Sequence, residues 1–399
     1  MLSNHAMPSR LQVASLSLLL CAAALPAFAQ QTSLFTETAH GALKYRPYAN
    51  HGADEDTVNI LPDFSWAGYK FSEVPIPDVP VAVTLVPQEG DDRIRIQQAI
   101  DQIAQLEPDE NGFRGALLLK AGYYEVNGAL VIRQSGIVIR GEKQASAEEG
   151  GTQIHASRAR SYDLFNFFGP DEPSGAKSSR RVRIVRDVPT GTRDLVVADP
   201  SGFAAGDLIH VLRTPNDAWI DDIGMREYGW TPGSYSIFYE RTITAVSGDT
   251  ITVDVPMVQA LTEKYGLGEI YHYDASYRLR NVGIEDLYLT SLYASETDEN
   301  HANRAIYFQN VEDAWARRVT AKYFQRGTVT INWGYRITVE DCALVDPKSL
   351  ISGSRRYSFE INKGSFNLFQ RIYTRNGRHD QVTGSRVAGP NVYVDNYSE

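Results

Sequence analysis

Cysteine is nearly absent from this chain, and its scarcity excludes two kinds of scaffold. Only Cys21 and Cys342 occur in 399 residues. Cys21 lies in an N-terminal apolar stretch that processing would remove, so the mature chain would keep one cysteine and form no intrachain disulfide. No histidines and cysteines stand at the spacing of zinc ligands. The fold must therefore be held together by a packed core and by hydrogen-bonded ladders.

Long apolar runs are also missing once the first 29 residues are set aside, so we expect no membrane span. Within those residues, Arg10 precedes the apolar stretch 11–25, and Ala27-Phe28-Ala29 is a small-x-small cleavage site. The stretch is too short for a membrane anchor and is ended by Pro26. We therefore predict a signal peptide over 1–29, cleaved after Ala29, and a secreted or periplasmic protein.

Positive charge is in deficit. The chain carries 39 Lys and Arg against 49 Asp and Glu, and the signal peptide holds one arginine and no acid, so the mature net charge moves from −10 to −11. That balance argues against a nucleic-acid partner. Tyrosine, in contrast, is abundant at 22 residues, and its flat amphipathic ring suits both packing and contact with sugars.

Residues 90–142 carry the most distinctive pattern in the chain. An acidic-glycine turn offers Asp91 or Asp92 as N-cap of a short helix. The helix has one apolar face, formed by Ile96, Ala99, Ile100 and Ile103. Short strands follow, interrupted at Ala121-Gly122, Asn127-Gly128 and Ser135-Gly136. A helix followed by evenly spaced short strands is typical of the capped start of a β-solenoid.

The order of these segments, I-Q-Q-A-I, then L-L-L-K-A-G-Y-Y, then I-V-I-R-G-E, resembles the opening of the pectate-lyase superfamily. That superfamily comprises right-handed parallel β-helices of polysaccharide lyases, rhamnogalacturonases and related epimerases. The resemblance implies an all-β fold, a right-handed parallel β-helix with a short N-terminal capping helix. It further implies a secreted bacterial protein that acts on polysaccharides.

The remaining chain divides by composition. Proline-rich residues 30–89 should wrap the N-terminal end, with the aromatic side chains of 62–69 packed on the first coil. We expect the cap and first coils over 90–182, and a small antiparallel β insert over 183–261, where strands alternate. Apolar repeats spaced 23 to 32 residues apart predict further coils over 262–399.

The final repeat ends at Tyr397, and no polar cap follows it. A solenoid normally carries such a cap. We therefore expect the chain to be truncated at its C-terminus, or this end to be covered by a partner. The sequence leaves the oligomeric state open.

Basic residues gather between positions 317 and 378. Twelve occur there, namely Arg317, Arg318, Lys322, Arg326, Arg336, Lys348, Arg355, Arg356, Lys363, Arg371, Arg375 and Arg378. Four acids interrupt them, Glu340, Asp341, Asp346 and Glu360, which leaves a local excess of +8. Stacked coils would align such residues into a stripe that attracts a polyanion. For a secreted protein, a uronic-acid polysaccharide is the natural polyanion; a solvated basic face balancing acidic ones is the alternative.

On such a polymer, β-elimination is the reaction that basic residues explain best. A cation neutralises the uronate carboxylate, a base removes the C5 proton, and a donor protonates the leaving oxygen. We predict His379 as base, Asp380 as its orienting partner, Arg378 as a carboxylate ligand and Tyr357 as proton donor. Arg355, Arg356, Lys322 and Arg326 are the predicted substrate-binding residues.

Three alternatives remain open at this point. Glu285-Asp286, Glu312-Asp313 and Glu340-Asp341 could hold Ca²⁺, or form ladders with Arg317 and Arg318, which we favour. A glycoside hydrolase would need two carboxylates, which Asp346 could form with Asp380 or Glu360. A non-catalytic sugar-binding or adhesive β-helix would need neither His379 nor Tyr357.

Overall fold

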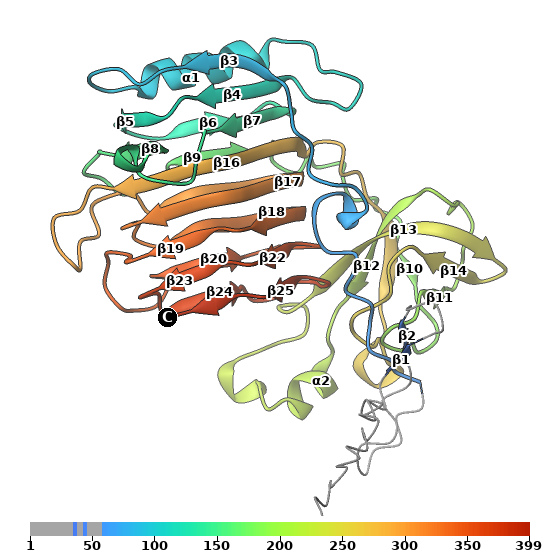
Figure 1. Cartoon of the computed structure of the whole chain (residues 1–399). Helices are drawn as coiled ribbons and strands as arrows, with labels where there is room; N and C mark the ends of the chain where they lie inside the picture. The colour runs from blue at the N-terminus through green and yellow to red at the C-terminus, as the bar shows by residue number, and fades with distance from the viewer. Residues whose placement is uncertain (1–34, 38–42, 46–57) are drawn as a thin grey trace, which may run out of the picture. The chain divides into compact units, whose positions relative to one another are not determined.

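The computed structural model describes residues 35–37, 43–45 and 58–399 (Figure 1). The predicted signal peptide lies outside the described residues. The chain divides into two compact units, Met1–Arg46 and Pro47–Glu399. In the first, strands β1 (Phe35–Glu37) and β2 (Leu43–Tyr45) pair antiparallel. No helix in the described residues has the length and apolarity needed to cross a membrane.

The second unit begins its solenoid with the predicted helix, α1 (Arg93–Ala104), which buries all four residues of the predicted apolar face. Asp92 occupies the N-cap position, but its carboxylate binds the Arg95 side chain instead of a helix N–H. Asp91 supplies the acceptor, because its Oδ1 takes the backbone N–H groups of Arg93 and Asn127 at 2.9 and 3.0 Å. The turn therefore joins the start of the helix to the coil beneath it.

The predicted right-handed parallel β-helix is confirmed, with each coil passing through three parallel ladders in turn (Figure 1). The first ladder contains β3 (Val81–Leu85), β4 (Gly115–Leu119), β7 (Ile137–Arg140), β22 (Leu368–Gln370) and β25 (Val392–Val394). The second contains β5 (Gly122–Val126), β8 (Thr152–Ala156), β19 (Ala343–Val345), β23 (Tyr373–Arg375) and β26 (Tyr397–Ser398). The third contains β6 (Leu130–Ile132), β9 (Phe165–Phe168), β20 (Tyr357–Ile361) and β24 (His379–Thr383).

Three long strands bend around the corners and so belong to more than one ladder. These are β16 (Leu279–Ser291), β17 (Arg304–Lys322) and β18 (Gly327–Glu340), with β21 (Gly364–Ser365) paired beside β18. The bends place residues in the left-handed backbone region, as at Asn310 (φ 53°) and Asp341 (φ 53°). Asparagine and aspartate tolerate that region better than most side chains, so their presence at corners is expected.

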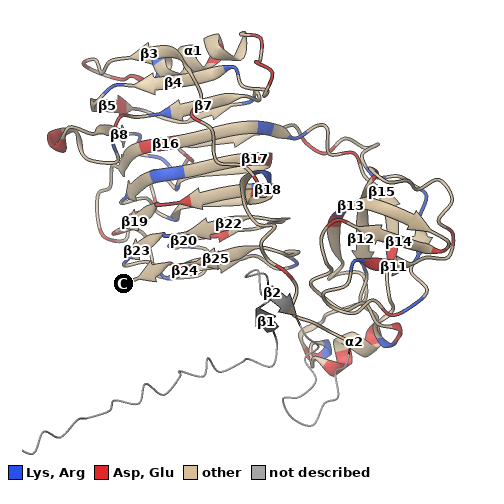
Figure 2. Cartoon of the chain, turned by 45° about the vertical axis from the view of Figure 1, so that its right-hand side comes forward, with Lys and Arg blue, Asp and Glu red and all other residues tan. Residues whose placement is uncertain are grey.

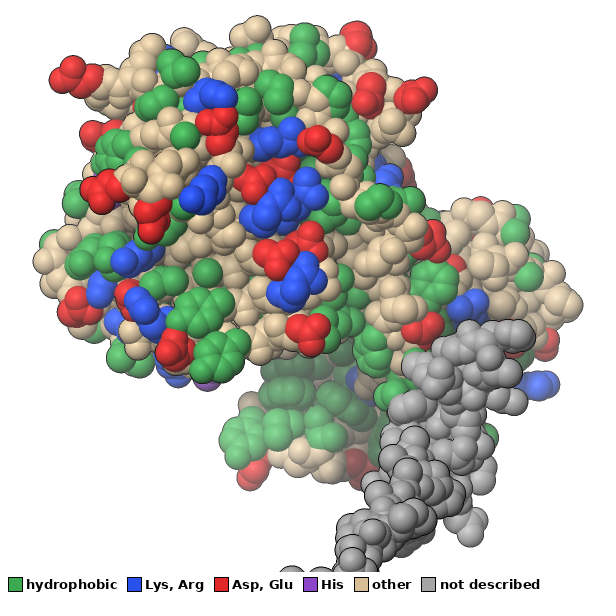
Figure 3. Space-filling view, viewed as in Figure 1, with side chains coloured by type: hydrophobic (Ala, Val, Ile, Leu, Met, Phe, Trp, Pro, Cys, Tyr) green, Lys and Arg blue, Asp and Glu red, His purple; other side chains and the backbone are tan. Residues whose placement is uncertain are grey.

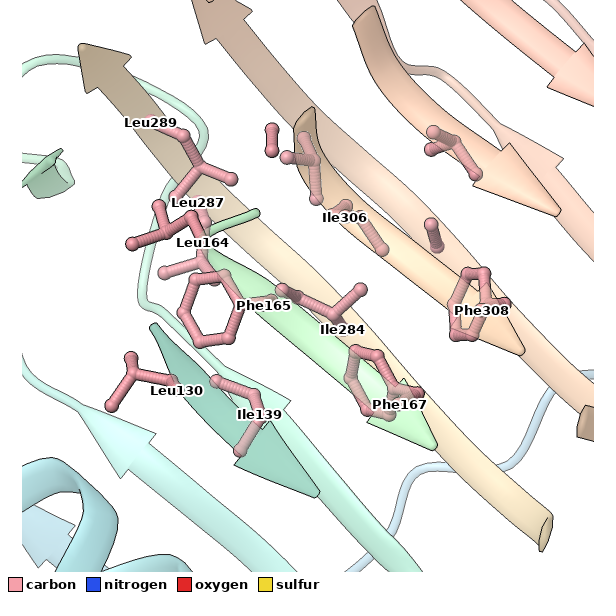
Figure 4. Packing of buried hydrophobic residues seen from close by; sticks show 14 of the residues in the cluster. Leu130, Ile139, Leu164, Phe165, Phe167, Ile284, Leu287, Leu289, Ile306 and Phe308 are labelled. Atoms are coloured by element: carbon pink, nitrogen blue, oxygen red, sulfur yellow. The ribbon is translucent and has the colours of Figure 1, made fainter. Parts of the chain in front are cut away.

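Alternate apolar residues point into the stack, as the repeat pattern predicts. Ile284, Ala316 and Val339 lie in successive coils and are each 0% exposed. Figure 4 shows aromatic rings from β9 and β17 packed between coils, and the ring centroids of Phe167 and Phe308 are 4.9 Å apart. Each such buried side chain contributes about 1.5–3 kcal/mol. Cys342 is inward and buried as predicted, and burial raises the pKa of its thiol to about 12.

The predicted antiparallel insert is also present, between β9 and β16. The described residues form a six-stranded sheet there, in the order β10-β15-β12-β13-β14-β11. Its strands are β10 (Val182–Arg183), β11 (Asp194–Val196), β12 (Leu208–Arg213), β13 (Ile237–Ser247), β14 (Thr250–Val253) and β15 (Glu269–His272). Strand β15 lies after residue 261, where we expected coils to resume; its alternating E-I-Y-H pattern fits a coil strand equally well. The insert also contains the short helices α2 (Asp217–Asp222), η3 (Arg226–Tyr228) and η4 (Glu263–Tyr265). Outside it lie η1 (Tyr69–Ser72), before β3, and η2 (Ala147–Glu149), between β7 and β8.

A buried ion network joins the insert to the solenoid. Arg278, 3% exposed, lies 2.9 Å from Glu240 Oε1 on β13 and 3.4 Å from Glu312 Oε2 on β17. Burial opposes ionisation of Glu240, but Arg278 and His210 outweigh it and hold the pKa of Glu240 below its usual range. Removing one member of such a network would leave a buried charge unpaired, so the insert is held by strongly coupled contacts.

The aromatic segment 62–69 reaches beyond the first coil, because Tyr69 shares a buried cluster with Ala116 of β4 and also contacts later strands. Tyr69 lies edge-on against Trp315 of β17, with ring centroids 5.3 Å apart, and its N–H donates to Thr338 Oγ1 of β18 at 2.8 Å. These strands belong to later coils, not to the first. The reason lies in Gly283, because a Cβ there would meet the Trp315 ring at 2.2 Å, so only glycine leaves room for the indole.

Candidate functional site

Charged side chains on the first ladder alternate in sign from coil to coil. Arg140, Glu285, Arg317 and Glu340 follow one another in register. Glu285 is 0% exposed, and its two carboxylate oxygens lie 2.5 Å from the Nε atoms of Arg140 and Arg317. Figure 3 shows basic and acidic side chains alternating down this face, and Figure 2 marks the charged positions on β16, β17 and β18. We call this arrangement of ion pairs the charge ladder.

Because of the charge ladder, the basic residues do not form the free cationic stripe that we expected to attract a polyanion. Within the described chain, eight of the twelve basic residues of 317–378 form ion pairs: Arg317, Arg318, Arg326, Arg336, Lys348, Arg355, Arg371 and Arg375. Arg318, for example, binds Asp286, which is 32 residues earlier. Five of the eight pair with acids that lie before position 317, so a charge count along the window omits those acids. The basic excess is largely neutralised in space, and the favoured alternative for Glu285-Asp286 is the one observed.

The predicted catalytic residues come together only in part. Tyr357 and His379 are paired in register on β20 and β24, with ring centroids 5.2 Å apart. Asp380 was expected to orient His379, but its Oδ1 accepts a hydrogen bond from Ser358 Oγ at 2.5 Å. Arg378 is exposed beside them. Catalysis by these four residues stays a prediction.

Three of the four predicted substrate-binding residues are engaged within the protein. Arg356 is 9% exposed, and its guanidinium donates to the backbone carbonyls of Ser349 at 2.8 Å and Glu296 at 3.3 Å. It therefore ties two loops together and does not present its charge to solvent. Arg355 and Arg326 are each held by a glutamate, at 2.5 and 2.7 Å. Lys322 differs from all three.

A groove on the second ladder brings Lys322 close to aromatic residues. Its hollow, of about 380 Å³, is lined by Tyr123, Gln153, His155, Thr290, Ser291, Leu292, Tyr293 and Tyr323. We call it the tyrosine groove. Strands β5, β8 and β16 supply most of these side chains, because outward positions of the ladder align in register, and Tyr323 directly follows β17. One such column runs Glu125, His155, Thr290, Lys322.

His155 is the titratable residue inside the tyrosine groove. Its Nδ1 lies 3.0 Å from Thr290 Oγ1, and its ring stacks on that of Tyr123 with centroids 5.9 Å apart. Burial lowers the pKa of His155 below the ordinary value of 6.5, against a smaller opposing effect of Glu125. The imidazole is therefore uncharged at neutral pH. No described residue binds its Nε2, and in the tautomer whose Nδ1–H donates to Thr290 this nitrogen can accept a proton.

Lys322 is the cation at the end of the same column. No carboxylate lies within ion-pair distance of its ammonium among the described residues, in contrast to Arg318 in the same strand. Its Nζ is 4.7 Å from the centre of the Tyr323 ring. A hydrogen bond with Tyr323 raises the pKa of Lys322, with smaller contributions from Tyr288 and Asp346. Lys322 is thus charged and available to a ligand.

Tyr323 occupies a strained corner. Its φ is 73°, and the equivalent positions in the next two coils are Asp346 (φ 53°) and Asn376 (φ 59°). Those residues tolerate the left-handed region, whereas a bulky tyrosine there costs about 1–3 kcal/mol. The Tyr323 ring lies against that of Tyr293, with centroids 4.8 Å apart. Placing tyrosine at this corner therefore costs conformational free energy, and packing alone does not explain why tyrosine is used.

Carboxylate clusters suitable for a metal are not found among the described residues. The paired acids that could have held Ca²⁺ are used otherwise. Asp286 binds Arg318 through both oxygens, at 2.5 and 2.7 Å, and Asp313 binds Arg336 at 2.7 Å. These guanidinium groups occupy the positions where a cation would bind.

No family model matches the chain, and no curated protein matches it in sequence. Among solved structures, it is similar to the tailspike protein gp49 from Pseudomonas phage LKA1, with 15% identity and a TM-score of 0.46 over 75% of this chain and 43% of that chain. The tailspike gp61 of Pseudomonas phage phi297 gives 15% identity and a TM-score of 0.44, over 76% and 43%. Iota-carrageenase complexed to iota-carrageenan fragments gives 9% and 0.36, over 82% and 46%. The chain spans less than half of each protein, and similarity at this level carries no argument about function.

Sequence reasoning selected Lys322 but missed its neighbours in the groove. His155 and Thr290 are 135 residues apart, with the insert between them. Aligning G-Y-Y-E-V (122–126) with T-Q-I-H-A (152–156) would have placed Glu125 beside His155. The next coil could not be aligned without knowing where the insert ends.

Proposed function

We propose that the protein is a secreted polysaccharide lyase that binds a uronic-acid-containing polysaccharide along the tyrosine groove and cleaves it by β-elimination. One observation carries this proposal: an uncharged imidazole, an unpaired ammonium and several phenol rings share one outer face of the solenoid. Flat tyrosine rings suit the apolar faces of sugars, and the ammonium suits their carboxylates. The apolar stretch before Ala29 supports export.

The side chains of this face can supply each group that β-elimination needs. Lys322 binds the uronate carboxylate and stabilises the charge that develops on it as the C5–H bond breaks. Nε2 of His155 takes the C5 proton. A double bond forms between C4 and C5 while the bond from C4 to the glycosidic oxygen breaks. The Tyr323 hydroxyl gives that oxygen a proton, and solvent exchange restores both side chains.

Two alternatives are tested alongside. Tyr357 and His379 form a second candidate pair, because their rings are in contact. Glycoside hydrolysis is the alternative reaction, and it needs two carboxylates about 5–10 Å apart. Of the carboxylates named for it, Asp346 and Glu360 are each bound to an arginine, at 2.6 and 2.7 Å, and Asp380 accepts a hydrogen bond from Ser358 at 2.5 Å. The free imidazole of the tyrosine groove and the Lys322 ammonium in the same column favour elimination over hydrolysis.

The deciding experiment uses the full chain, a panel of uronate polysaccharides and ultraviolet absorbance, since unsaturated products absorb and the intact polymer does not. We expect absorbance to rise with the wild type and to be lost in His155→Ala. His379→Ala is the matched control, and it should retain activity. Loss of activity in His379→Ala alone would place the catalytic centre on β24. New reducing ends without absorbance would establish hydrolysis, and binding without either signal would overturn catalysis.

A further inference from the structure

A second hollow lies where the third ladder ends and the chain enters and leaves the insert. It measures about 240 Å³, and its lining includes Glu172, Lys177, Gln309, Asn310, Asn332 and Trp333. The two carboxamides Gln309 and Asn332 are paired in register on β17 and β18. Neither the tyrosine groove nor the Tyr357 and His379 pair shares a lining residue with it.

The amides in this hollow offer complementary groups. Gln309 Oε1 accepts from the Tyr307 hydroxyl at 3.0 Å, and no described residue binds the Gln309 amide nitrogen. Asn310 donates through Nδ2 to the Pro170 carbonyl at 2.9 Å, and its own Oδ1 has no partner in the described chain. A donor and an acceptor therefore remain together. A sugar hydroxyl, which both donates and accepts, matches such a pair.

Trp333 supplies an aromatic surface at an unfavourable corner. Its φ is 56°, while Asn310, at the same corner one coil earlier, has φ 53°. Asparagine suits this backbone region, but a bulky indole there costs about 1–3 kcal/mol. Trp333 stays half-buried, and its ring is parallel to that of Phe238 from the insert, with centroids 5.6 Å apart and 2° between planes. The strained corner holds an indole beside the amides, and burial in the core does not explain it.

The charges of the hollow distinguish it from the tyrosine groove. Lys177 Nζ lies 2.6 Å from Glu172 Oε1, so this cation is neutralised within the protein. Glu172 also accepts from the Tyr273 hydroxyl at 2.9 Å. Asp171 adds a further acid to the lining. A uronate would find no unpaired cation among these lining residues, whereas an uncharged sugar meets no electrostatic penalty.

We propose that this hollow is a second glycan site, which binds an uncharged sugar unit with its ring against Trp333 and its hydroxyls on Gln309 and Asn310. The site is independent of the lyase proposal, because it uses other residues and another class of sugar. Its affinity rests on one aromatic contact and a few hydrogen bonds.

The test measures binding of uncharged hexasaccharides of glucose, xylose, mannose and galactose to the full chain by titration calorimetry. At least one should bind, and Trp333→Asn should weaken its binding at least tenfold. Trp333→Asn reproduces the residue that the previous coil uses at this corner, so the thermal midpoint should be unchanged or higher. Gln309→Ala, which leaves the corner intact, should weaken binding about fivefold through one lost hydrogen bond.

Trp230→Ala is the matched control, since Trp230 stacks on Tyr235 within the insert and lies outside the hollow. It should bind as the wild type does. Absence of binding across the panel, or wild-type affinity in both Trp333→Asn and Gln309→Ala, would overturn the proposal. Uronate cleavage measured on the same variants should not change, so failure of this site and failure of the lyase proposal give different results.

Discussion

The first and second ladders of the solenoid share one backbone plan but use their outward residues in opposite ways. On the first ladder, arginine and glutamate alternate, and Glu285 satisfies cations from the coils before and after it. On the second, His155 and Lys322 stand in one column with Thr290 between them, and neither forms an ion pair with a described residue. The charge ladder pairs its charges within the protein, whereas His155 and Lys322 leave theirs for a ligand; further along the second ladder, Arg375 is paired with Asp346.

This difference shows what a stacked fold does to charge. Parallel coils repeat about every thirty residues, so an acid and a base one coil apart become neighbours across a ladder. Where positive and negative side chains alternate, their ion pairs fix the register of the coils and produce little net electrostatic field. Where an uncharged imidazole and a lone ammonium alternate with hydroxyls, the same geometry produces a row of free functional groups. We therefore expect functional residues where outward charged or titratable side chains have no ion-pair partner in the adjacent coils.

Lys322→Ala should produce the largest effect on the second ladder. Removing a charge that stabilises the developing negative charge should lower kcat/KM on a uronate polymer about 10²- to 10³-fold. The thermal midpoint should change little, because no ion pair is lost. Steady-state ultraviolet assays and thermal melts on the same preparation measure the two effects.

Arg318→Ala is the matched control for that substitution, since Arg318 lies on the same strand but is paired with Asp286. It should cleave the uronate polymer with the wild-type kcat/KM and lose less than about 1 kcal/mol of stability. Equal losses of activity in the two variants would show that the contrast between the ladders has no functional meaning.

Glu285→Ala should produce the largest effect on the first ladder, and it should act on stability. Glu285 is fully buried and binds Arg140, Arg317 and the Trp315 indole N–H at 3.1 Å. Its loss leaves partly buried cations unpaired, which should cost about 3 kcal/mol in urea unfolding. Activity per folded molecule should stay at the wild-type value. A stable Glu285→Ala protein with reduced kcat would place the first ladder in the site.

Much of the fold could be predicted because its signals are local. The apolar face of α1, the inward Ile284 and the buried Cys342 each follow from spacing within a few residues. The end of the insert could not be predicted, since β15 carries a pattern that suits an antiparallel strand or a coil. Packing of Tyr69 on Trp315 was also missed, because the indole lies over Gly283, its register partner in the coil before.

The site could be predicted less well, for a related reason. The charge of Arg318 looks free along the chain and is paired in space, while His155 looks isolated and lies beside Thr290. Both facts depend on which coils are neighbours, and the insert separates those coils in sequence. For Lys322 alone, the prediction from the sequence and the structure agree that the charge is available to a ligand.

The pH dependence of cleavage gives the finest test of the second ladder. Groups facing His155 are Tyr123 and Glu125 on β5, Thr290 on β16 and, one strand further, Lys322 on β17. Because burial lowers the pKa of His155, kcat/KM should stay high below pH 6.5 and fall only at more acidic values. Glu125→Gln removes an effect that raises this pKa, so the acid limb should move further down.

The stability of the protein should follow the same titration. The folded pKa of His155 is lowered relative to the unfolded chain, so below pH 6.5 the unfolded state binds the proton more readily. Stability that is present above pH 6.5 is therefore lost as the pH falls, and His155→Gln should lessen that loss. An acid limb at or above pH 6.5, unmoved by Glu125→Gln, would assign the base to another residue.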